Sequence, residues 1–316
     1  MNLKGQKIFI TGGAGFISSH FIERIIDDNE VVVFDNLHRN ALQYANLEKH
    51  KNLSLVKGDV LDSEALNTAL DNADIVIHMA SIAGVGTVVS LPTTTLKINL
   101  IGSYNLLEAC RNKNIKRYIT FSTSEVYGPN VYQADESGFT TLGPIGKPRW
   151  MYALSKLASE FLAESYQRQF GMKFTSIRPF NVYGPRQIGE GAIHSFILQA
   201  LKDEPLTVHN NGSQVRSWCY VDDMVDAMQK ILENKKSEGE VFNIGNPQST
   251  STTLQTAETV IRLSSSRSKI IFKEIEYPEV EIRVPSIEKA KRILGFEPKV
   301  SFEEGIKKTI DWYKKH

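Results

Sequence analysis

The pattern of hydrophobic and polar positions in residues 7–36 predicts one β-α-β unit. The apolar run Lys7-Ile-Phe-Ile-Thr11 precedes a cluster of glycines, and an amphipathic pattern with helical spacing follows the glycines. A second run, Val31-Val-Val-Phe34, is rich in β-branched residues and ends at the carboxylate of Asp35. Two short apolar runs on either side of an amphipathic helix are typical of neighbouring parallel strands.

The same alternation continues to residue 178. Strands are expected at 53–56, 74–78, 117–121 and 173–178, with helices at 63–70, 95–112 and 151–170. This alternation predicts an α/β fold of the Rossmann type, a doubly wound parallel sheet with helices on both faces. Ligands bind such sheets beyond the carboxyl ends of the strands, and the predicted strands here end in small or polar residues.

The pattern changes after Asn181, where Pro, Gly and polar residues become frequent and the helices become short. Strands are expected at 206–209, 214–221, 241–244 and 269–274, with a loop after the last, and helices at 254–263, 287–294 and 302–316. We therefore predict a first domain at 1–180 and a smaller α/β lobe at 181–316. Part of 214–245 is expected to return to the first domain.

The glycine cluster Thr11-Gly-Gly-Ala-Gly-Phe-Ile17 has the position of a dinucleotide-binding fingerprint, between a strand and a helix. Gly12 suits the tight turn, and Gly15 lets the backbone approach a pyrophosphate at the helix N-terminus. Ser18 replaces the third glycine of the usual pattern, and we interpret this small side chain as a tolerated variation.

Two acidic residues follow the second and third predicted strands. Asp35 can accept both ribose hydroxyls of NAD and would repel the 2′-phosphate of NADP, although Arg39 nearby in the sequence weakens that inference. Asp59 either accepts from the adenine amino group or caps the turn that leads to Ser63. The first domain is therefore predicted to bind NAD.

A second group of residues indicates the type of chemical reaction. Tyr152 and Lys156 lie four residues apart on one helical face, after a strand end that reads Ser122-Thr-Ser-Glu125. A lysine ammonium beside a phenol favours the phenolate and lowers its pKa, which is ordinarily about 10. Such a phenolate could take the proton of a sugar hydroxyl, with Thr123 or Ser124 holding the same oxygen, while hydride leaves for NAD. The alternative is a plain surface pair.

Composition limits the partners. Lys and Arg number 37 against 36 Asp and Glu, so the charge gives no reason to expect nucleic acid or an acidic membrane. Cys110 and Cys219 lie far apart and form no metal or redox motif. No signal-like pattern begins the sequence and no apolar run approaches 18 residues, so we expect a cytoplasmic protein.

The chain resembles the extended short-chain dehydrogenase/reductases, in the NAD-dependent epimerase/dehydratase family of nucleotide-sugar enzymes. The resemblance covers residues 7–313. It rests on 11–17, Asp35-Asn36, Gly58-Asp-Val60, His78-Met-Ala-Ser81, Asn99-Leu-Ile-Gly102, Ser122-Thr-Ser-Glu-Val-Tyr-Gly128, Tyr152 with Lys156, Arg178-Pro-Phe-Asn-Val-Tyr-Gly-Pro-Arg186, Arg216 with Tyr220-Val-Asp-Asp223, and Asn243-Ile-Gly245.

The resemblance implies roles for the matching residues. Tyr152 would be the catalytic base, tuned by Lys156, while Thr123 or Ser124 orients the sugar. NAD would be bound by Gly12, Gly15, Phe16, Ile17, Asp35, Asn36, Asp59, Val60, Ala80, Ser81, Asn99 and Lys156. The substrate, most simply a uridine-diphosphate (UDP) sugar, would be bound by Asn181, Arg186, Arg216, Arg283 and Arg149. The helices at 95–112 and 151–170 resemble those that form a four-helix homodimer contact.

Glu125 is the residue that bears on the exact reaction. Members of this group typically oxidise C4 of the sugar to a ketone, after which epimerisation, 4,6-dehydration or decarboxylation can follow. A simple epimerase has no obvious need for a carboxylate beside Ser124, whereas dehydratases and glucuronate decarboxylases carry one. The usual dehydratase pair is Asp-Glu, although some guanosine-sugar dehydratases also have Thr-Ser-Glu. A buried, hydrogen-bonded structural carboxylate is the alternative interpretation.

Two further segments favour decarboxylation of a UDP-hexuronate. The segment that ends at the predicted catalytic tyrosine is similar to that of UDP-glucuronate decarboxylases, and so is a segment near the C-terminus; they read Leu142-Gly-Pro-Ile-Gly-Lys-Pro-Arg-Trp-Met-Tyr152 and Arg283-Val-Pro-Ser-Ile287. Arg149 or Arg283 could hold a substrate carboxylate, but each could equally bind phosphate or form a structural ion pair. A glucuronate 4-epimerase would also need such an arginine. An NAD-binding sensor without catalysis is the hypothesis from another class, and its mark would be a broken Tyr152–Lys156 pair.

Overall fold

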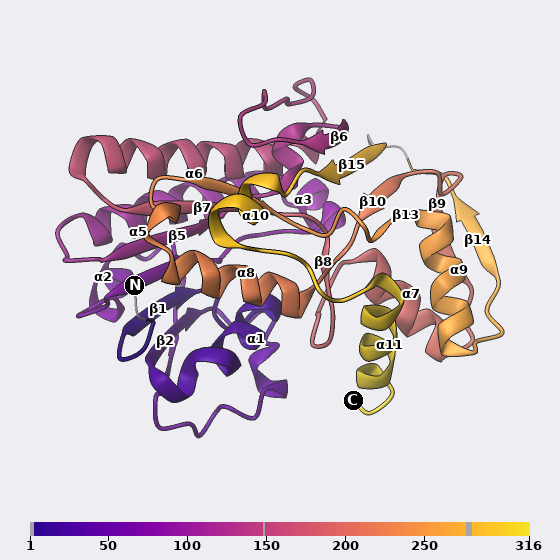
Figure 1. Cartoon of the computed structure of the whole chain (residues 1–316), viewed down its shortest axis with the longest axis horizontal. Helices are drawn as coiled ribbons and strands as arrows, with labels where there is room; N and C mark the ends of the chain where they lie inside the picture. The colour runs from indigo at the N-terminus through magenta and orange to yellow at the C-terminus, as the bar shows by residue number, and fades with distance from the viewer. Residues whose placement is uncertain (1–2, 148, 276–279) are drawn as a thin grey trace.

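The computed structural model describes residues 3–147, 149–275 and 280–316, and its largest element is a parallel sheet between two layers of helices (Figure 1). The sheet has seven strands in the order β12-β7-β5-β4-β1-β2-β3, all of them paired in parallel. Their bounds are β1 Lys7–Thr11, β2 Glu30–Asp35, β3 Leu53–Lys57, β4 Ile75–His78, β5 Arg117–Phe121, β7 Phe174–Pro179 and β12 Val241–Ile244. The predicted Rossmann-type fold is confirmed.

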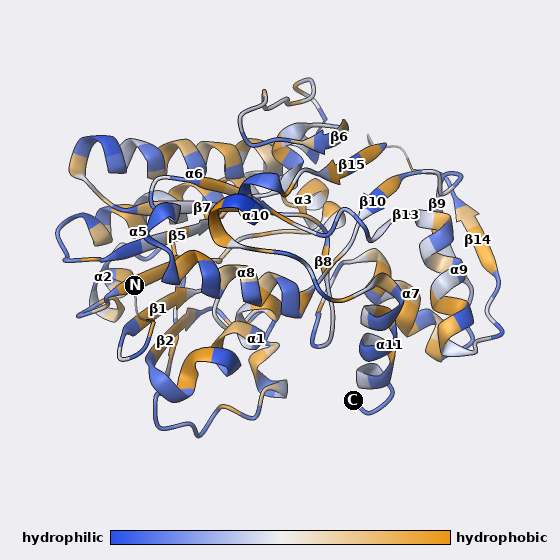
Figure 2. Cartoon of the chain, in the orientation of Figure 1, coloured by the Kyte–Doolittle hydropathy of each residue, from blue (hydrophilic) through white to orange (hydrophobic). Residues whose placement is uncertain are grey.

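Alternate side chains of each strand enter two separate cores. Ile8 and Ile10 pack on one face, beneath α1 (Phe16–Ile25) and α8 (Val221–Glu233). Phe9 packs on the other face with buried residues of α2 (Ser63–Ala69), α5 (Gly102–Arg111) and α6 (Arg149–Phe170). Burial of the sheet on both faces explains why inner strands such as β1 and β2 are nearly continuous apolar runs, which Figure 2 shows as mainly orange ribbons.

The remaining strands form three smaller sheets. Four strands pair in the order β13-β10-β15-β6, and β8 pairs with β11 and β9 with β14. Their bounds are β6 Asn130–Ala134, β8 Val182–Tyr183, β9 Leu206–His209, β10 Val215–Ser217, β11 Cys219–Tyr220, β13 Thr250–Thr252, β14 Ile270–Lys273 and β15 Ile282–Pro285. The other helices are α3 Val85–Ser90, α4 Pro92–Leu96, α7 Ala192–Leu201, α9 Thr253–Ser264, α10 Glu288–Leu294 and α11 Phe302–Tyr313.

Several predicted bounds are wrong. The strand expected at 214–221 is two short strands, β10 and β11, which belong to different sheets on either side of Trp218. The loop expected after 274 contains β15 within its range, while 276–279 lie outside the described residues. The helix expected at 95–112 begins at Pro92 and contains a π-helical stretch, Lys97–Ile101.

Candidate functional site

The glycine turn between β1 and α1 is set by close backbone contacts. Gly12 has φ 68°, and a Cβ there would lie 2.6 Å from the backbone nitrogen of Ala80, so only glycine fits. Ser18 is buried and donates to the carbonyl of Gly12 at 2.8 Å, which accounts for a serine in the third position of the fingerprint. None of the described side chains caps α1 at Gly15, so its first N–H groups are free to bind an anion.

Asp35 and the loop after β4 border this turn. The Asp35 carboxylate accepts from the backbone of Ala14 at 3.0 Å and of Leu37 at 2.7 Å, while burial raises its pKa. Arg39 donates to the carbonyl of Ala83 at 3.2 Å and to the hydroxyl of Thr87 at 3.4 Å. These bonds direct the Arg39 guanidinium to the loop after β4.

Other residues expected at the cofactor have structural partners. Asn99 is buried and both accepts from and donates to the backbone of Ile82, which fixes the loop that carries Ala80 and Ser81. Val60 is buried against Gly102. Asp59 accepts from the backbone of Leu61, Asn36 accepts from that of His38, and Asp62 rather than Asp59 caps α2.

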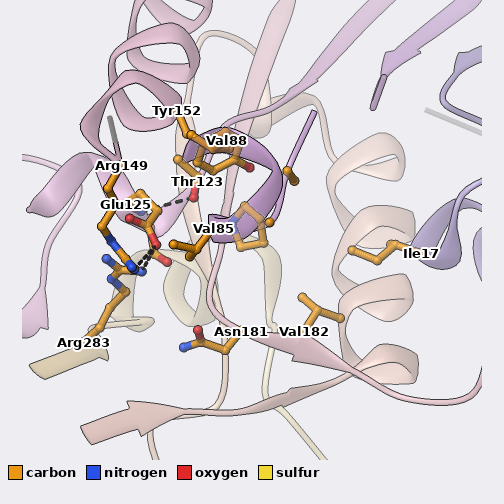
Figure 3. A pocket seen from close by; sticks show the side chains of 14 residues that line it. Ile17, Val85, Val88, Thr123, Glu125, Arg149, Tyr152, Asn181, Val182 and Arg283 are labelled. Carbon is orange, nitrogen blue, oxygen red and sulfur yellow. Dashed lines mark hydrogen bonds and ion pairs between the residues drawn. The ribbon is translucent and has the colours of Figure 1, made fainter. Parts of the chain in front are cut away.

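A cavity of about 310 Å³ opens beside the carboxyl ends of the main strands (Figure 3). It is lined by Ile17, Ala83, Gly84, Val85, Val88, Thr123, Ser124, Glu125, Arg149, Tyr152, Pro179, Asn181, Val182 and Arg283. The structure thus brings together in one cavity the three predicted residues of the β5 end, Tyr152, and the substrate-binding candidates Asn181, Arg149 and Arg283.

Glu125 lies between two arginines on one side of this cavity (Figure 3). Its Oε1 accepts from Arg283 at 2.7 Å and from Arg149 at 3.2 Å. These positive charges outweigh the cost of burial and lower the pKa of Glu125 to about 2. Four atoms of this cluster are buried without a hydrogen-bond partner among the described residues: Oε2 of Glu125, Nε of Arg149, and Nε and Nη2 of Arg283. The cluster can therefore bind a further group that both accepts and donates hydrogen bonds.

Tyr152 is partly buried, Lys156 is buried, and both have shifted pKa values. Burial and the negative charge of Glu125 raise the pKa of Tyr152 to about 12, although hydrogen bonds with Thr123 and Ser81 act in the opposite direction. Burial lowers the pKa of Lys156 to about 8. The predicted lowering of the Tyr152 pKa is therefore not found in the chain by itself, because burial and the charge of Glu125 outweigh the effects that act in the opposite direction.

Buried polar bonds fix helix α6, which carries this pair. Asn99 donates to the hydroxyl of Ser155 at 3.1 Å, and Ser103 bonds Ser159 at 3.0 Å. Arg178 of β7 pairs with Glu160 at 2.6 Å, with both side chains buried. These bonds tie α6 to its neighbouring helix and to the sheet, so they hold Tyr152 at the cavity.

A second, wider cavity of about 430 Å³ shares Glu125, Arg149, Asn181 and Arg283 with the first. It extends into the C-terminal half, where it is also lined by Gln187, Glu190, Ser195, Phe196, Thr207, His209, Arg216, Trp218 and Thr253. Arg216, a predicted substrate-binding residue, donates to the carbonyl of Val280 at 2.6 Å and lines this space.

Arg186 is the predicted substrate residue that the structure does not bring to either cavity. It pairs with Glu23 of α1 at 2.9 Å and is absent from both linings. Conversely, the motifs did not predict the apolar wall formed by Val85 and Val88 of α3, or the contribution of α7. The run Ala192-Ile-His-Ser-Phe-Ile-Leu198 before Leu201 carried a helical signal for α7 that could have been used.

Two other kinds of site are absent from the part of the chain that the structure describes. No group of three or more His, Cys, Asp or Glu side chains there could hold a metal ion. Among the same residues, every helix is too short or too polar to cross a bilayer.

The chain is similar to known nucleotide-sugar enzymes. Residues 8–245 match the model of the NAD dependent epimerase/dehydratase family. The chain is 34% identical to UDP-N-acetyl-alpha-D-glucosaminuronate decarboxylase of Bacillus cytotoxicus, with 98% of each chain covered. It is 39% identical to UDP-glucuronic acid decarboxylase 3 of Arabidopsis thaliana, over 95% of this chain and 87% of that one.

The chain is also similar in fold to solved structures of UDP-sugar epimerases. UDP-glucuronic acid 4-epimerase of Bacillus cereus, in complex with UDP-glucuronic acid and NAD, has a TM-score of 0.90 and 30% identity over 98% of this chain and 99% of that one. UDP-glucose 4-epimerase of Thermotoga maritima, with UDP-glucose, has a TM-score of 0.89 and 32% identity over the same shares. The family resemblance seen in the motifs is thereby confirmed.

Proposed function

Because the chain belongs to the NAD-dependent epimerase/dehydratase family, we propose that it is an NAD-dependent decarboxylase of a UDP-hexuronate that works through transient oxidation of sugar C4. The cluster of Glu125, Arg149 and Arg283 is the observation that carries this proposal. Its buried, unpartnered N–H groups suit the planar oxygens of a carboxylate, which a guanidinium binds bidentately. Both decarboxylase relatives are named for uronate substrates.

The residues present fit NAD as the cofactor. The uncapped N-terminus of α1 suits a pyrophosphate, the Gly12 turn leaves no room for a side chain, and Asp35 stands at the end of β2 where a ribose hydroxyl acceptor is needed. When bound, NAD accepts the hydride of sugar C4 and later returns it.

Tyr152 takes the proton of the C4 hydroxyl, and Thr123 or Ser124 bonds the same oxygen. The resulting C4 ketone accepts the electron pair that the C6 carboxylate leaves behind when it departs as carbon dioxide. Arg283 and Arg149 hold that carboxylate beforehand, and a proton then replaces it at C5. Lys156 supplies charge behind Tyr152 because its pKa of about 8 keeps it mostly protonated at pH 7.

The wide cavity suits the rest of the substrate. Arg216 lies on its wall, and Asn181 lies where the two cavities meet. We propose that this space takes the nucleoside diphosphate, with Arg216 near its phosphates. The sugar then extends toward Tyr152.

A UDP-hexuronate 4-epimerase is the second candidate, favoured by the likeness to the Bacillus cereus 4-epimerase. The same arginines would then retain the carboxylate. A 4,6-dehydratase has less support, because it needs an acid and a base to eliminate the C6 hydroxyl. Glu125, with a pKa of about 2, is poorly matched to either task at neutral pH, and Ser124 replaces the other acid.

Incubation with UDP-glucuronate tests the proposal. We expect release of carbon dioxide in step with formation of a UDP-pentose, measured by labelled-carbon capture and by chromatography of the nucleotide sugars. Epimerised UDP-hexuronate without carbon dioxide would favour the second candidate. An unchanged substrate, with UDP-N-acetylglucosaminuronate tested in parallel and also unchanged, would contradict both.

We also propose a homodimer through α5 and α6. Four large apolar side chains on or beside these helices are 45–63% exposed. They are Ile101 just before α5, Tyr104 in α5, and Leu154 and Phe161 in α6. Helices α5 and α6 are neighbours on the same face of the main sheet, so these side chains can form one apolar surface.

A cytoplasmic location is proposed too, since Cys110 and Cys219 are both free thiols in the interior.

A further inference from the structure

Glu190 joins two segments that lie more than 100 residues apart. Its Oε2 accepts from the backbone of Gly86 at 2.7 Å, and its Oε1 accepts from the backbone of Thr87 at 2.8 Å and from the Thr87 hydroxyl at 2.6 Å. Arg39 donates to the same hydroxyl at 3.4 Å and to the carbonyl of Ala83 at 3.2 Å. We call Glu190, Gly86, Thr87 and Arg39 the Glu190 clasp.

Two glycines make the clasp sterically possible. Gly84 has φ 105°, and a Cβ there would lie 2.7 Å from the carboxyl carbon of Glu190. Gly189 has φ 93°, and a Cβ there would lie 2.8 Å from the guanidinium carbon of Arg39. Both backbones therefore adopt a conformation that side chains rarely allow, and each does so where a clasp residue lies directly against it. The close contact of the three segments is thus built into the backbone itself.

The clasp lies at the junction of the two cavities. Gly84 and Val85 line both of them, and Glu190 lines the wider one. Val85 and Val88 belong to α3, a helix of six residues that begins directly after Gly84 and has no side-chain cap of its own. Glu190 supplies the acceptors for two of the first N–H groups of this helix, and such charge-assisted bonds are among the stronger ones.

We infer that Glu190 is a positioning residue for the substrate pocket: it holds α3, and with it the Val85–Val88 wall, against the sugar opposite Glu125 and the arginines. This inference rests on the proposed function for the identity of the sugar, but not for the clasp itself. Helix α3 has only six residues and packs against α4 and α6. Because α6 is held by its own buried bonds to the neighbouring helix and the sheet, losing the Glu190 carboxylate should loosen the wall while Tyr152 stays in place. The expected effect is on substrate affinity and not on the chemical step.

The test compares Glu190→Ala with Glu303→Ala as the matched control, because Glu303 forms an exposed ion pair with Arg262 away from both cavities. Hydrogen exchange followed by mass spectrometry reads the amides of residues 84–90 in each protein. We expect exchange of this segment to become at least about 10-fold faster in Glu190→Ala, as the loss of charged hydrogen bonds implies, and to stay unchanged in the control.

Kinetics and binding complete the test. For Glu190→Ala we expect KM for UDP-glucuronate to rise about 10-fold with kcat within about 2-fold of the parent. Thr87→Ser, which keeps the hydroxyl, should behave as the parent, whereas Thr87→Val should move KM in the same direction as Glu190→Ala. Unchanged exchange at 84–90, or a fall in kcat with KM unchanged, would overturn the inference.

The two proposals fail in different ways. If the parent protein does not turn over UDP-glucuronate, the proposed function fails, and the clasp is then judged by hydrogen exchange and by the affinity for UDP measured calorimetrically. Unchanged exchange would overturn the clasp whatever the substrate, and faster exchange with weaker UDP binding would support it.

Discussion

Replacing Glu125 with glutamine is the sharpest perturbation of the site, because it removes one charge and hardly changes the shape. The ordinary pKa of a glutamate is 4.5 and that of Glu125 is about 2. At about 1.4 kcal/mol for each pKa unit, the folded protein gains about 3 kcal/mol from this ionised carboxylate at pH 7. Arg149 and Arg283, both buried, would lose their shared counter-charge in the variant.

The stabilisation by Glu125 should depend on pH in a defined direction. Since the pKa of Glu125 is lower in the folded state, its contribution is fully present above pH 4.5 and is lost as the pH falls through about 2. Glu125→Gln should therefore be about 3 kcal/mol less stable than the parent at pH 7, and at pH 3 the difference should be roughly half as large.

Urea denaturation followed by fluorescence at pH 7 and at pH 3 measures this difference. Glu303→Gln is the control, since its exposed pair with Arg262 should contribute less than about 1 kcal/mol. The electrostatic reasoning would be refuted if Glu125→Gln lost the same unfolding free energy, relative to the parent, at both pH values. It would also be refuted if this loss were no larger than that of the control.

Four other outcomes are expected. Tyr152→Phe should lower kcat about 10²- to 10⁴-fold while binding NAD normally, by kinetics and calorimetry; unchanged turnover would remove Tyr152 from catalysis. Lys156→Met should raise Tm at pH 7, a gain that shrinks as pH rises from 8 to 10.5, because burial lowers the Lys156 pKa from 10.5 to about 8. Arg283→Lys should raise KM for UDP-glucuronate at least about 10-fold but leave affinity for UDP unchanged. Phe161→Glu should give a monomer by light scattering, whereas Phe139→Glu, on a loop where that side chain is 99% exposed, should not.

The main sheet was predictable because its strands are short, nearly continuous apolar runs separated by amphipathic helices. Six of its seven strands lie within residues 7–179, and alternate side chains along them point into two cores. The glycine turn was also predictable, because a Cβ at Gly12 meets the backbone of Ala80 and the sequence must avoid one.

The second half was harder because its elements are short and depend on distant partners. The segment at 214–221 reads as one strand, yet Arg216 pairs beside Arg283 in one sheet and Tyr220 beside Tyr183 in another. No local pattern records such a switch of partner. Strand β15 pairs in parallel with β10 and with β6, and this places Arg283 against Glu125, so the core of the site depends on a strand that was expected to be a loop.

The shift of the Tyr152 pKa could not be read from spacing. The sequence places Lys156 one turn away, but whether a phenol is ionised depends on how much water reaches it and on every charge nearby. Glu125, from another element, acts against ionisation, and so does burial. The position of Arg186, turned toward Glu23 on α1, likewise follows from the fold and not from the motif that contains it.

The edge position of β12 has a consequence for how the molecule is made. This strand completes the seven-stranded sheet beside β7, although 61 residues separate the end of one from the start of the other. During synthesis the edge of β7 must therefore wait, with its backbone groups unpaired, until the ribosome has released residue 244. A fragment that stops near residue 180 would expose that edge, and we expect it to aggregate where the full chain stays in solution.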